Sequence, residues 1–358
     1  MQKDQKDFLF SLLDTPSPSG FESAIQRVVR KRAEKYADTV EIDVHGNLTA
    51  CVNPKGKVRV MLAGHCDQIG LMVTHIDDKG FLYVDQIGGI DAAVLPGTRL
   101  MIHGREKSIP GIIGHKPVHL VPANDRGKKI ELSAVWVDIG AATAEEAKKV
   151  VAVGDPVTFA PYRELLGENI LSSQGCDDRV GVYVVMEAMR IFAAEIKKKG
   201  SHPVALYAVS TVQEEIGLRG ARTSAYGIDP QVGIAVDVTH ASDNPGASAK
   251  EIGTVLLGQG PTIARGPNIN PVLEGLLVET AKKKKLPWQS ISAPRATGTD
   301  ANAIQINRAG VAAALIGLPN RYMHSQVECV DLRDLQNAAQ LIAATVLGIS
   351  NKTSFIPV

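Results

Sequence analysis

Polar side chains follow several apolar runs of this sequence, at the point where each run ends. Two adjacent glutamates, Glu214 and Glu215, come directly after one of the most apolar runs, in the stretch STVQEEIGLRGA. Two aspartates, Asp177 and Asp178, stand at the start of a long apolar segment in GCDDRVG. Imidazoles and carboxylates bind metal ions and transfer protons in active sites. The other candidates of this kind are His65 and Asp67 in VRVMLAGHCD, Asp237 in GIAVDV, and His324 in AAALIGLPNRYMHS.

Each of these groups has an ordinary explanation when it is taken alone. An acid at a helix start, such as Asp177 or Asp178, commonly caps the helix. A lone histidine is more often a hydrogen-bonded residue at a domain edge, and two adjacent glutamates can form a solvated turn. Together they indicate a site, because buried parallel strands bring their carboxyl ends to one edge of a sheet, where ligands bind. Converging carboxylates raise one another's pKa, so a positive group is expected among them.

Two imidazoles and three carboxylates suit a pair of divalent ions bridged by one of the acids. The ions carry a surplus of positive charge over the three carboxylates, which would stabilise a bound hydroxide and then an oxyanion, as in hydrolases. Such ions lie roughly 3.5–4 Å apart, polarise a substrate carbonyl and lower the pKa of a bridging water. One of the adjacent glutamates then binds metal, while its neighbour is free to act as general base. Asp67, two residues beyond His65, is expected to orient the imidazole.

The elements that must position these groups alternate between apolar strands and helices. A helix is predicted after the Pro/Gly/Ser break near the start, where Ser19 and Glu22 have capping-box spacing, and Asp331 is expected to cap the last helix. From about Asp77 to Tyr162 the texture changes, because short β-prone pieces lie between Gly and Pro turn signals, with one short helix near TAEEAKKVV. The pattern predicts an α/β fold that carries a small β-rich insert. Strands are expected at VRVMLAGH, PVALYAVSTV, VGIAVDV and VAAALIGL.

Composition excludes several classes of partner. The 358 residues are 44% hydrophobic and 22% charged, and their formal net charge of +1 provides no field that would attract nucleic acid or an anionic membrane. The start, MQKDQKDFLFSLL, lacks the apolar core of a signal peptide, and no later run is long enough to span a membrane. A cytoplasmic location is therefore expected. The four cysteines have no paired spacing and are expected to be reduced thiols, Cys66 in a packing role.

Six ordered motifs resemble those of the tetrahedral (TET) metallo-aminopeptidases, a family that includes glutamyl, leucyl, lysyl and deblocking aminopeptidases and some members labelled endoglucanase. The motifs are GHCDQIGLMV, GCDDRVG, VQEEIGLRGA, AVDVTH, GTDANAI and RYMHSQVECVDLRD, and the resemblance covers essentially the whole chain. It implies a zinc-peptidase-like α/β/α catalytic domain formed by residues 1–70 and 163–358, with residues 71–162 as an inserted barrel-like dimerisation domain. Many members assemble twelve subunits into a hollow tetrahedron, so a homo-oligomer built from dimers is expected.

The resemblance also implies a role for each candidate residue. Asp177 would bridge two divalent ions, zinc or cobalt with manganese as an alternative. His65 and Asp237 would complete one ion, and Glu215 and His324 the other. The catalytic residues would be Glu214 as the base and Asp67 in the supporting position after His65. In ATGTDA, Thr297 stands where many members have glycine, which changes the local pocket shape.

The predicted activity is removal of amino-terminal residues from short peptides by a two-metal site. One alternative is glucan hydrolysis by the glutamate pair, which an aromatic content of only 4% disfavours because sugar clefts usually present stacking platforms. Another is a non-catalytic, metal-stabilised peptide-binding assembly, which the unliganded Glu214 disfavours. Arg295 and Asp300 are the candidate substrate-binding residues. Arg295 could pair with an acidic substrate side chain, or it could be a solvated surface arginine.

Overall fold

The apolar runs form the centre of an eight-stranded sheet with the order β1-β2-β12-β3-β13-β16-β14-β15. The computed structural model describes residues 1–357. The four central strands are parallel neighbours, which confirms the predicted arrangement: β12 (Val204–Thr211), β3 (Val58–His65), β13 (Val232–His240) and β16 (Ala312–Asn320). The flanking strands are β1 (Thr39–Ile42), β2 (Leu48–Val52), β14 (Thr262–Arg265) and β15 (Gln289–Ser292).

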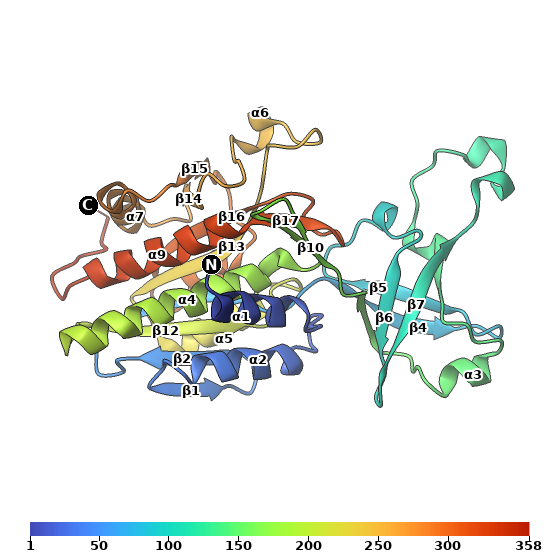
Figure 1. Ribbon diagram of the computed structural model, residues 1–358, viewed down its shortest axis with the longest axis horizontal. Helices are drawn as coiled ribbons and strands as arrows, with labels where there is room; N and C mark the ends of the chain where they lie inside the picture. The colour runs from blue at the N-terminus through green and yellow to red at the C-terminus, as the bar shows by residue number, and fades with distance from the viewer. Residues whose placement is uncertain (358) are drawn as a thin grey trace.

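Helices cover both faces of this sheet, so alternate residues of each central strand enter two different cores (Figure 1). The larger core lies under α1 (Lys3–Leu13), α2 (Ser23–Ala33), α4 (Cys176–Lys199), α7 (Pro271–Lys284) and α9 (Leu332–Gly348). The smaller core lies under α5 (Arg219–Ile228) and α8 (Asp300–Gln305). On β3, for example, Leu62 belongs to the larger core and Met61 to the smaller one. The expected α/β/α architecture is thereby confirmed.

A closed barrel projects from one end of the α/β body (Figure 1). Its strands follow the order β4-β5-β8-β7-β6-β9 around an apolar core of its own, which confirms the expected barrel-like insert. The barrel also carries α3 (Ala144–Lys148) and the short 3-10 helices Ala92–Val94, Val118–Leu120, Ala123–Asp125 and Leu132–Ala134. The barrel strands are β4 (Gly70–Ile76), β5 (Leu82–Ile87), β6 (Arg99–His103), β7 (Ser108–His115), β8 (Val135–Asp138) and β9 (Pro156–Phe159).

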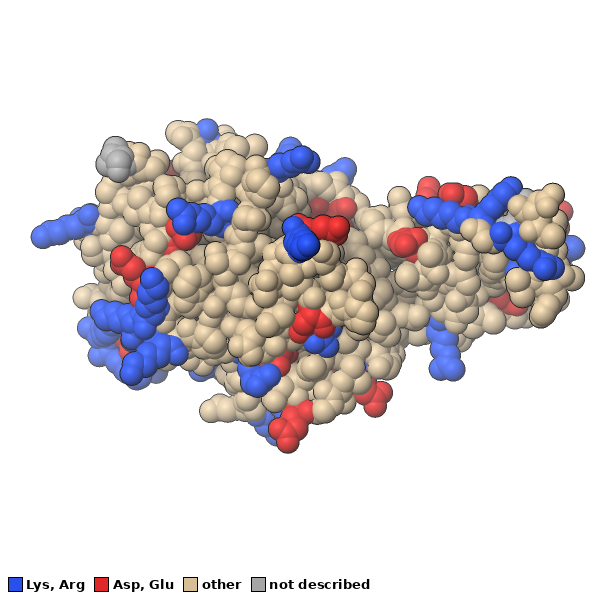
Figure 2. All heavy atoms as spheres, turned by 90° about the horizontal axis from the view of Figure 1, so that it is seen from above, with Lys and Arg blue, Asp and Glu red and all other residues tan. Residues whose placement is uncertain are grey.

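Two peripheral features complete the α/β body. A three-stranded antiparallel sheet is built from β10 (Arg163–Leu166), β11 (Ile170–Ser173) and β17 (Glu328–Asp331), and α6 (Ala249–Ile252) lies in the loop after β13. Figure 2 shows lysines and arginines gathered at the end of the body far from the barrel, where α4 and α7 both end in lysines. These lysines are exposed at the C-terminal ends of the helices, where a positive charge interacts favourably with the helix dipole. They are solvated, as the sequence predicted. Within residues 1–357, every helix is either too short or too polar to span a bilayer.

One predicted helix start is wrong. Helix α2 begins at Ser23, and its N-cap residue Glu22 makes no capping hydrogen bond, so Ser19 and Glu22 do not form a capping box. The Ser19 hydroxyl instead donates to Asp67 Oδ2 at 2.6 Å, and Glu22 Oε1 accepts from the Gly20 amide at 2.7 Å. The Ser19 side chain therefore makes a tertiary hydrogen bond to Asp67 instead of capping the helix as its spacing had predicted. The cap predicted at Asp331 is confirmed, because its side chain accepts from the Arg333 amide.

Candidate metal centre and active site

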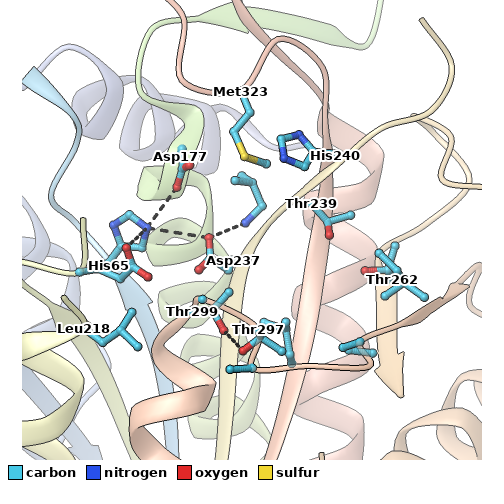
Figure 3. A pocket seen from close by; sticks show the side chains of 18 of the residues that line it. His65, Asp177, Leu218, Asp237, Thr239, His240, Thr262, Thr297, Thr299 and Met323 are labelled. Carbon is cyan, nitrogen blue, oxygen red and sulfur yellow. Dashed lines mark hydrogen bonds and ion pairs between the residues drawn. The ribbon is translucent and has the colours of Figure 1, made fainter. Parts of the chain in front are cut away.

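The fold brings the predicted ligand residues together at the carboxyl edge of the central strands. Parallel pairing places Thr211 beside His65, and the chain then continues from Thr211 into Glu214 and Glu215. Asp177 lies at the start of α4, and His324 lies in the loop after β16. Figure 3 shows His65, Asp177 and Asp237 pointing toward one another across this edge. Residues that are distant in the sequence therefore share one buried cluster.

Asp177 lies between the two histidine rings. Its Oδ1 is 3.1 Å from His65 Nε2, and its Oδ2 is 3.2 Å from His324 Nε2. A second carboxylate approaches each ring, with Asp237 Oδ1 3.8 Å from His65 Nε2 and Glu215 Oε2 3.6 Å from His324 Nε2. The cluster thus divides into two imidazole–carboxylate groups that share Asp177. In this position Asp177 could be shared by two ions, if both groups bind metal.

Asp178 also lies close to His65, but its oxygens already accept backbone hydrogen bonds. Ligand atoms of His65, Asp178 and Asp237 lie within 4.8 Å of one another. Asp178 Oδ2 accepts from the His65 amide at 3.2 Å, and its Oδ1 accepts from the Gly181 amide at 3.1 Å. The peptide bond between Asp177 and Asp178 is cis. Asp178 therefore fixes the backbone of a histidine and caps a helix, which agrees with the simpler explanation of an acid at this position.

The cluster has the electrostatics of a cation site. Burial raises the pKa of Glu214 to about 10 and the pKa values of Glu215 and Asp237 to about 8; neighbouring carboxylates add to this effect, and His65 opposes it. Burial also acts to raise the pKa of Asp177, but hydrogen bonds from His324 and His65 outweigh it and hold the pKa low. The Oε1 atom of Glu215 is buried without a hydrogen-bond partner. Nitrogen and oxygen donors, an unpartnered carboxylate oxygen and clustered buried carboxyl groups that a cation would help to ionise fit divalent ions.

Asp67 holds both the histidine and the glutamate pair in place. Its Oδ1 accepts from the Glu214 amide at 3.0 Å, and its Oδ2 accepts from the Glu215 amide at 3.2 Å. His65 Nδ1 lies 3.3 Å from Asp67 Oδ1 and 3.1 Å from the Asp67 carbonyl oxygen. The backbone of the two glutamates is thereby fixed, while their carboxylates diverge. Glu214 Oε2 lies 3.8 Å from His65 Nε2, whereas Glu215 approaches His324.

Glu328 is a supporting residue to which the sequence motifs assigned no role. Its Oε2 accepts from the Asp177 amide at 3.1 Å, and its Oε1 accepts from the His324 amide at 2.9 Å. Only 1% of Glu328 is exposed, and burial raises its pKa to about 8. One buried carboxyl group thus ties together the backbones of two candidate ligands. The signal available in the sequence was an acid at the start of the short apolar strand ECVD.

A cavity of about 720 Å³ opens beside the cluster. Arg295 is exposed and lines the cavity, and so does Thr297, whose hydroxyl lies 2.9 Å from that of Thr299 (Figure 3). Asp300 does not line the cavity. It is buried beneath the cavity wall, where its Oδ2 accepts from the Thr211 hydroxyl at 2.6 Å. The two candidate substrate-binding residues therefore occupy different environments.

The chain resembles known aminopeptidases over nearly its whole length. It is 42% identical over 342 residues to a protein named lysyl aminopeptidase from Pyrococcus furiosus, an overlap of 94% of this chain and 95% of the relative. The structure of the TET aminopeptidase from the marine sediment archaeon Thaumarchaeota archaeon SCGC AB-539-E09 has a TM-score of 0.92 and 33% identity, covering 98% of both chains. The TET1 peptidase of Pyrococcus horikoshii has a TM-score of 0.85 and 29% identity, covering 96% of this chain and 100% of that one.

These similarities, together with the α/β sheet, define the class of this protein as a peptide hydrolase, an aminopeptidase. Residues 46–341 match the family described as M42 glutamyl aminopeptidase. The chain belongs to that family. The resemblance to TET aminopeptidases that the sequence motifs indicated is therefore confirmed.

Proposed function

We propose that this protein is a dinuclear metal-dependent aminopeptidase that removes amino-terminal residues from short peptides. The observation that carries the proposal is the position of Asp177, with one carboxylate oxygen toward His65 and the other toward His324. His65 and Asp237 would hold one ion, Glu215 and His324 would hold the other, and Asp177 would be shared. Zinc and cobalt suit these nitrogen and oxygen donors, and manganese is an alternative. Two ions bound there would polarise a peptide carbonyl and lower the pKa of a water.

Glu214 is the proposed general base. Its carboxylate is almost fully buried at the edge of the cavity, and its amide is held by Asp67. Bound divalent ions would lower the raised pKa of Glu214, so that its carboxylate accepts a proton from the attacking water and returns that proton to the amine of the leaving peptide. Asp67 acts by positioning His65 and the two glutamates. Asp300, hydrogen-bonded to Thr211 behind Glu214, supports the wall of the same site.

The barrel is the proposed dimerisation domain, with boundaries at residues 71–162, and residues 1–70 and 163–358 form the catalytic domain. The barrel exposes Ile112, Val118 and Leu120, each more than half accessible, and exposed apolar side chains of this kind are often covered by a partner. The TET1 peptidase of Pyrococcus horikoshii is described as assembling into a tetrahedron or a large octahedral shell. A dodecamer built from such dimers would admit short peptides and exclude folded proteins.

The first test is hydrolysis of aminoacyl-anilides and short peptides by protein that has been stripped of metal and reloaded with zinc, cobalt or manganese. We expect activity to disappear when the metal is removed and to return when it is restored, because a bound metal ion would act as the Lewis acid that polarises the substrate carbonyl. The matched control is the same peptide with an acetylated amino end, which an aminopeptidase leaves uncut. Full activity without metal, or cleavage of the acetylated peptide, would contradict the proposal.

Arg295 is the proposed determinant of preference for an acidic amino-terminal side chain. Among the described residues that line the cavity, every carboxylate belongs to the metal cluster or is Glu214, whereas Arg295 and His240 offer positive or donor groups. We expect Arg295→Ala to lower kcat/KM on a glutamyl anilide by about 10–150-fold, since a charge-assisted hydrogen bond contributes about 1.5–3 kcal/mol. The leucyl anilide should be unaffected.

The control for this prediction is Arg222→Ala, which removes an exposed arginine of α5 that does not line the cavity. A lysyl anilide completes the panel, because the relative from Pyrococcus furiosus is named a lysyl aminopeptidase. An unchanged ratio of glutamyl to leucyl rates in Arg295→Ala would sink the assignment of Arg295.

A further inference from the structure

The barrel contributes a backbone group to the metal cluster. The segment that leaves barrel strand β5 contains Gly88 and Gly89, and the Gly89 carbonyl accepts a hydrogen bond from His324 Nδ1 at 2.7 Å. Figure 1 shows β5 at the side of the barrel that faces the α/β body. Donation from Nδ1 fixes the tautomer of His324 and leaves Nε2 directed at Asp177 and Glu215.

Gly88 lies against the second ligand of the same group. A Cβ atom at this position would be 3.2 Å from Glu215 Cβ and 3.3 Å from Glu215 Oε2, and 3.0 Å from the Ile69 side chain. The φ angle of Gly88 is +74°, a conformation that L residues rarely adopt. Glycine therefore lets the barrel backbone approach Glu215 closely while its neighbour holds His324.

The Gly88–Gly89 segment contacts the ligands of only one of the two proposed ions. His324 and Glu215, which would hold one ion, both contact the Gly88–Gly89 segment. His65 is held instead by Asp67 and by Asp178, which belong to the α/β body. One half of the cluster is thus supported by the body alone, whereas the other half, whose backbone is held by Glu328 and Asp67, has additional contacts from the barrel.

We propose that the Gly88–Gly89 segment is a positioning element for the divalent ion at His324 and Glu215, so that retention of this ion depends on how the barrel sits against the body. This inference rests on the proposed dinuclear site. The segment orients the His324 ring through the Gly89 carbonyl and leaves room for the Glu215 carboxylate through the absence of a side chain at Gly88. The ion at His65 and Asp237 would be linked to the segment only through Asp177, which both ions share.

The test is a Zn²⁺ titration of metal-stripped protein by calorimetry, with the number of bound ions counted by elemental analysis. Wild type is expected to bind two ions. In Gly88→Ala, the ion at His324 and Glu215 is expected to bind roughly 10–100-fold more weakly, the usual effect of disturbing a group that orients a metal ligand. The other ion should lose much less affinity, since Asp177 is the one ligand that the two ions share. Gly88→Asn should behave in the same way, and asparagine tolerates a positive φ, so this variant keeps the fold while adding the same Cβ.

Gly89→Ala is the matched control. A Cβ there would lie 3.5 Å from His324 Nδ1, an ordinary van der Waals distance, and the carbonyl would remain. Both affinities should match those of wild type. Affinities that are unchanged in Gly88→Ala and Gly88→Asn, or that weaken equally at both positions, would overturn the inference. A wild type that binds fewer than two ions would instead overturn the proposed function.

A second measurement uses the wild type alone. Amide hydrogen exchange in the segment around residues 87–92 should slow when Zn²⁺ binds at His324 and Glu215 and should respond little to the ion at His65 and Asp237, because ordering His324 orders its barrel partner. An exchange rate that does not change during the Zn²⁺ titration would contradict the proposed coupling between the metal site and the barrel segment, independently of the results with the variants.

Discussion

We expect the Glu214→Gln substitution to lower kcat by about 10²–10⁴-fold while the bound metal stays in place. Glutamine keeps the size of the side chain but cannot accept the proton of the attacking water, and a positioned general base contributes about this factor. The Glu214 amide would still donate to Asp67, so the backbone at the site is retained. The measurement is kcat on an aminoacyl-anilide, with metal content determined on the same sample.

The neighbouring residue provides the control for this prediction. In Glu215→Gln the same chemical change falls on the carboxylate beside His324, so the expected loss is of one bound ion as well as of activity. Glu214→Gln that loses metal would make Glu214 a ligand rather than a base. Glu214→Gln that retains full activity would remove it from the reaction altogether.

We expect Arg179→Met to lower the free energy of unfolding by more than about 3 kcal/mol. Arg179 is fully buried, and its guanidinium donates to backbone carbonyls of Leu12, Leu13 and Thr15 and also to groups of Gln174 and Gly175. Methionine would fill the space but leave several of these acceptors without a partner, at about 1–3 kcal/mol each. Burial lowers the pKa of Arg179 to about 10, so the guanidinium stays charged at neutral pH. The measurement is denaturant unfolding of the metal-free protein.

The control is Arg222→Met, which makes the same change at an exposed position of α5 and should alter stability by no more than about 0.5 kcal/mol. Because Arg179 directly follows Asp178 and is two residues from Asp177, its loss should also weaken metal binding. Equal stability of the two variants would show that the buried guanidinium contributes little.

The sequence predicted the centre of the fold and the convergence of the ligand residues because both follow from one periodic signal. Near-continuous apolar runs such as VGIAVDV occur when both faces of a parallel strand are buried, and all parallel strands end at the same edge. His65 and Asp237 could therefore be placed together without any contact information. Their assignment to particular ions came from the family resemblance and stays a prediction.

The groups that hold these ligands could not be predicted, because their contacts join segments far apart in the sequence. Glu328 contacts Asp177, and the Gly89 carbonyl contacts His324, yet no local pattern marks either pairing. Ser19 illustrates the same limit, since its spacing to Glu22 fits a helix cap and its actual partner is Asp67. Local sequence reports local preferences, and tertiary hydrogen bonds override them where the two compete.

The position of the barrel within the chain also affects the order in which the two parts of the protein can fold during synthesis. The barrel is formed by contiguous residues, so it can close as soon as its own strands have emerged, whereas β3 pairs with β12 and β13 across the whole insert. The central sheet must wait for its later strands, and His324 is contributed later still. We therefore expect a nascent chain to fold its barrel before its active site is assembled, and aminopeptidase activity to appear only after His324 has been synthesised.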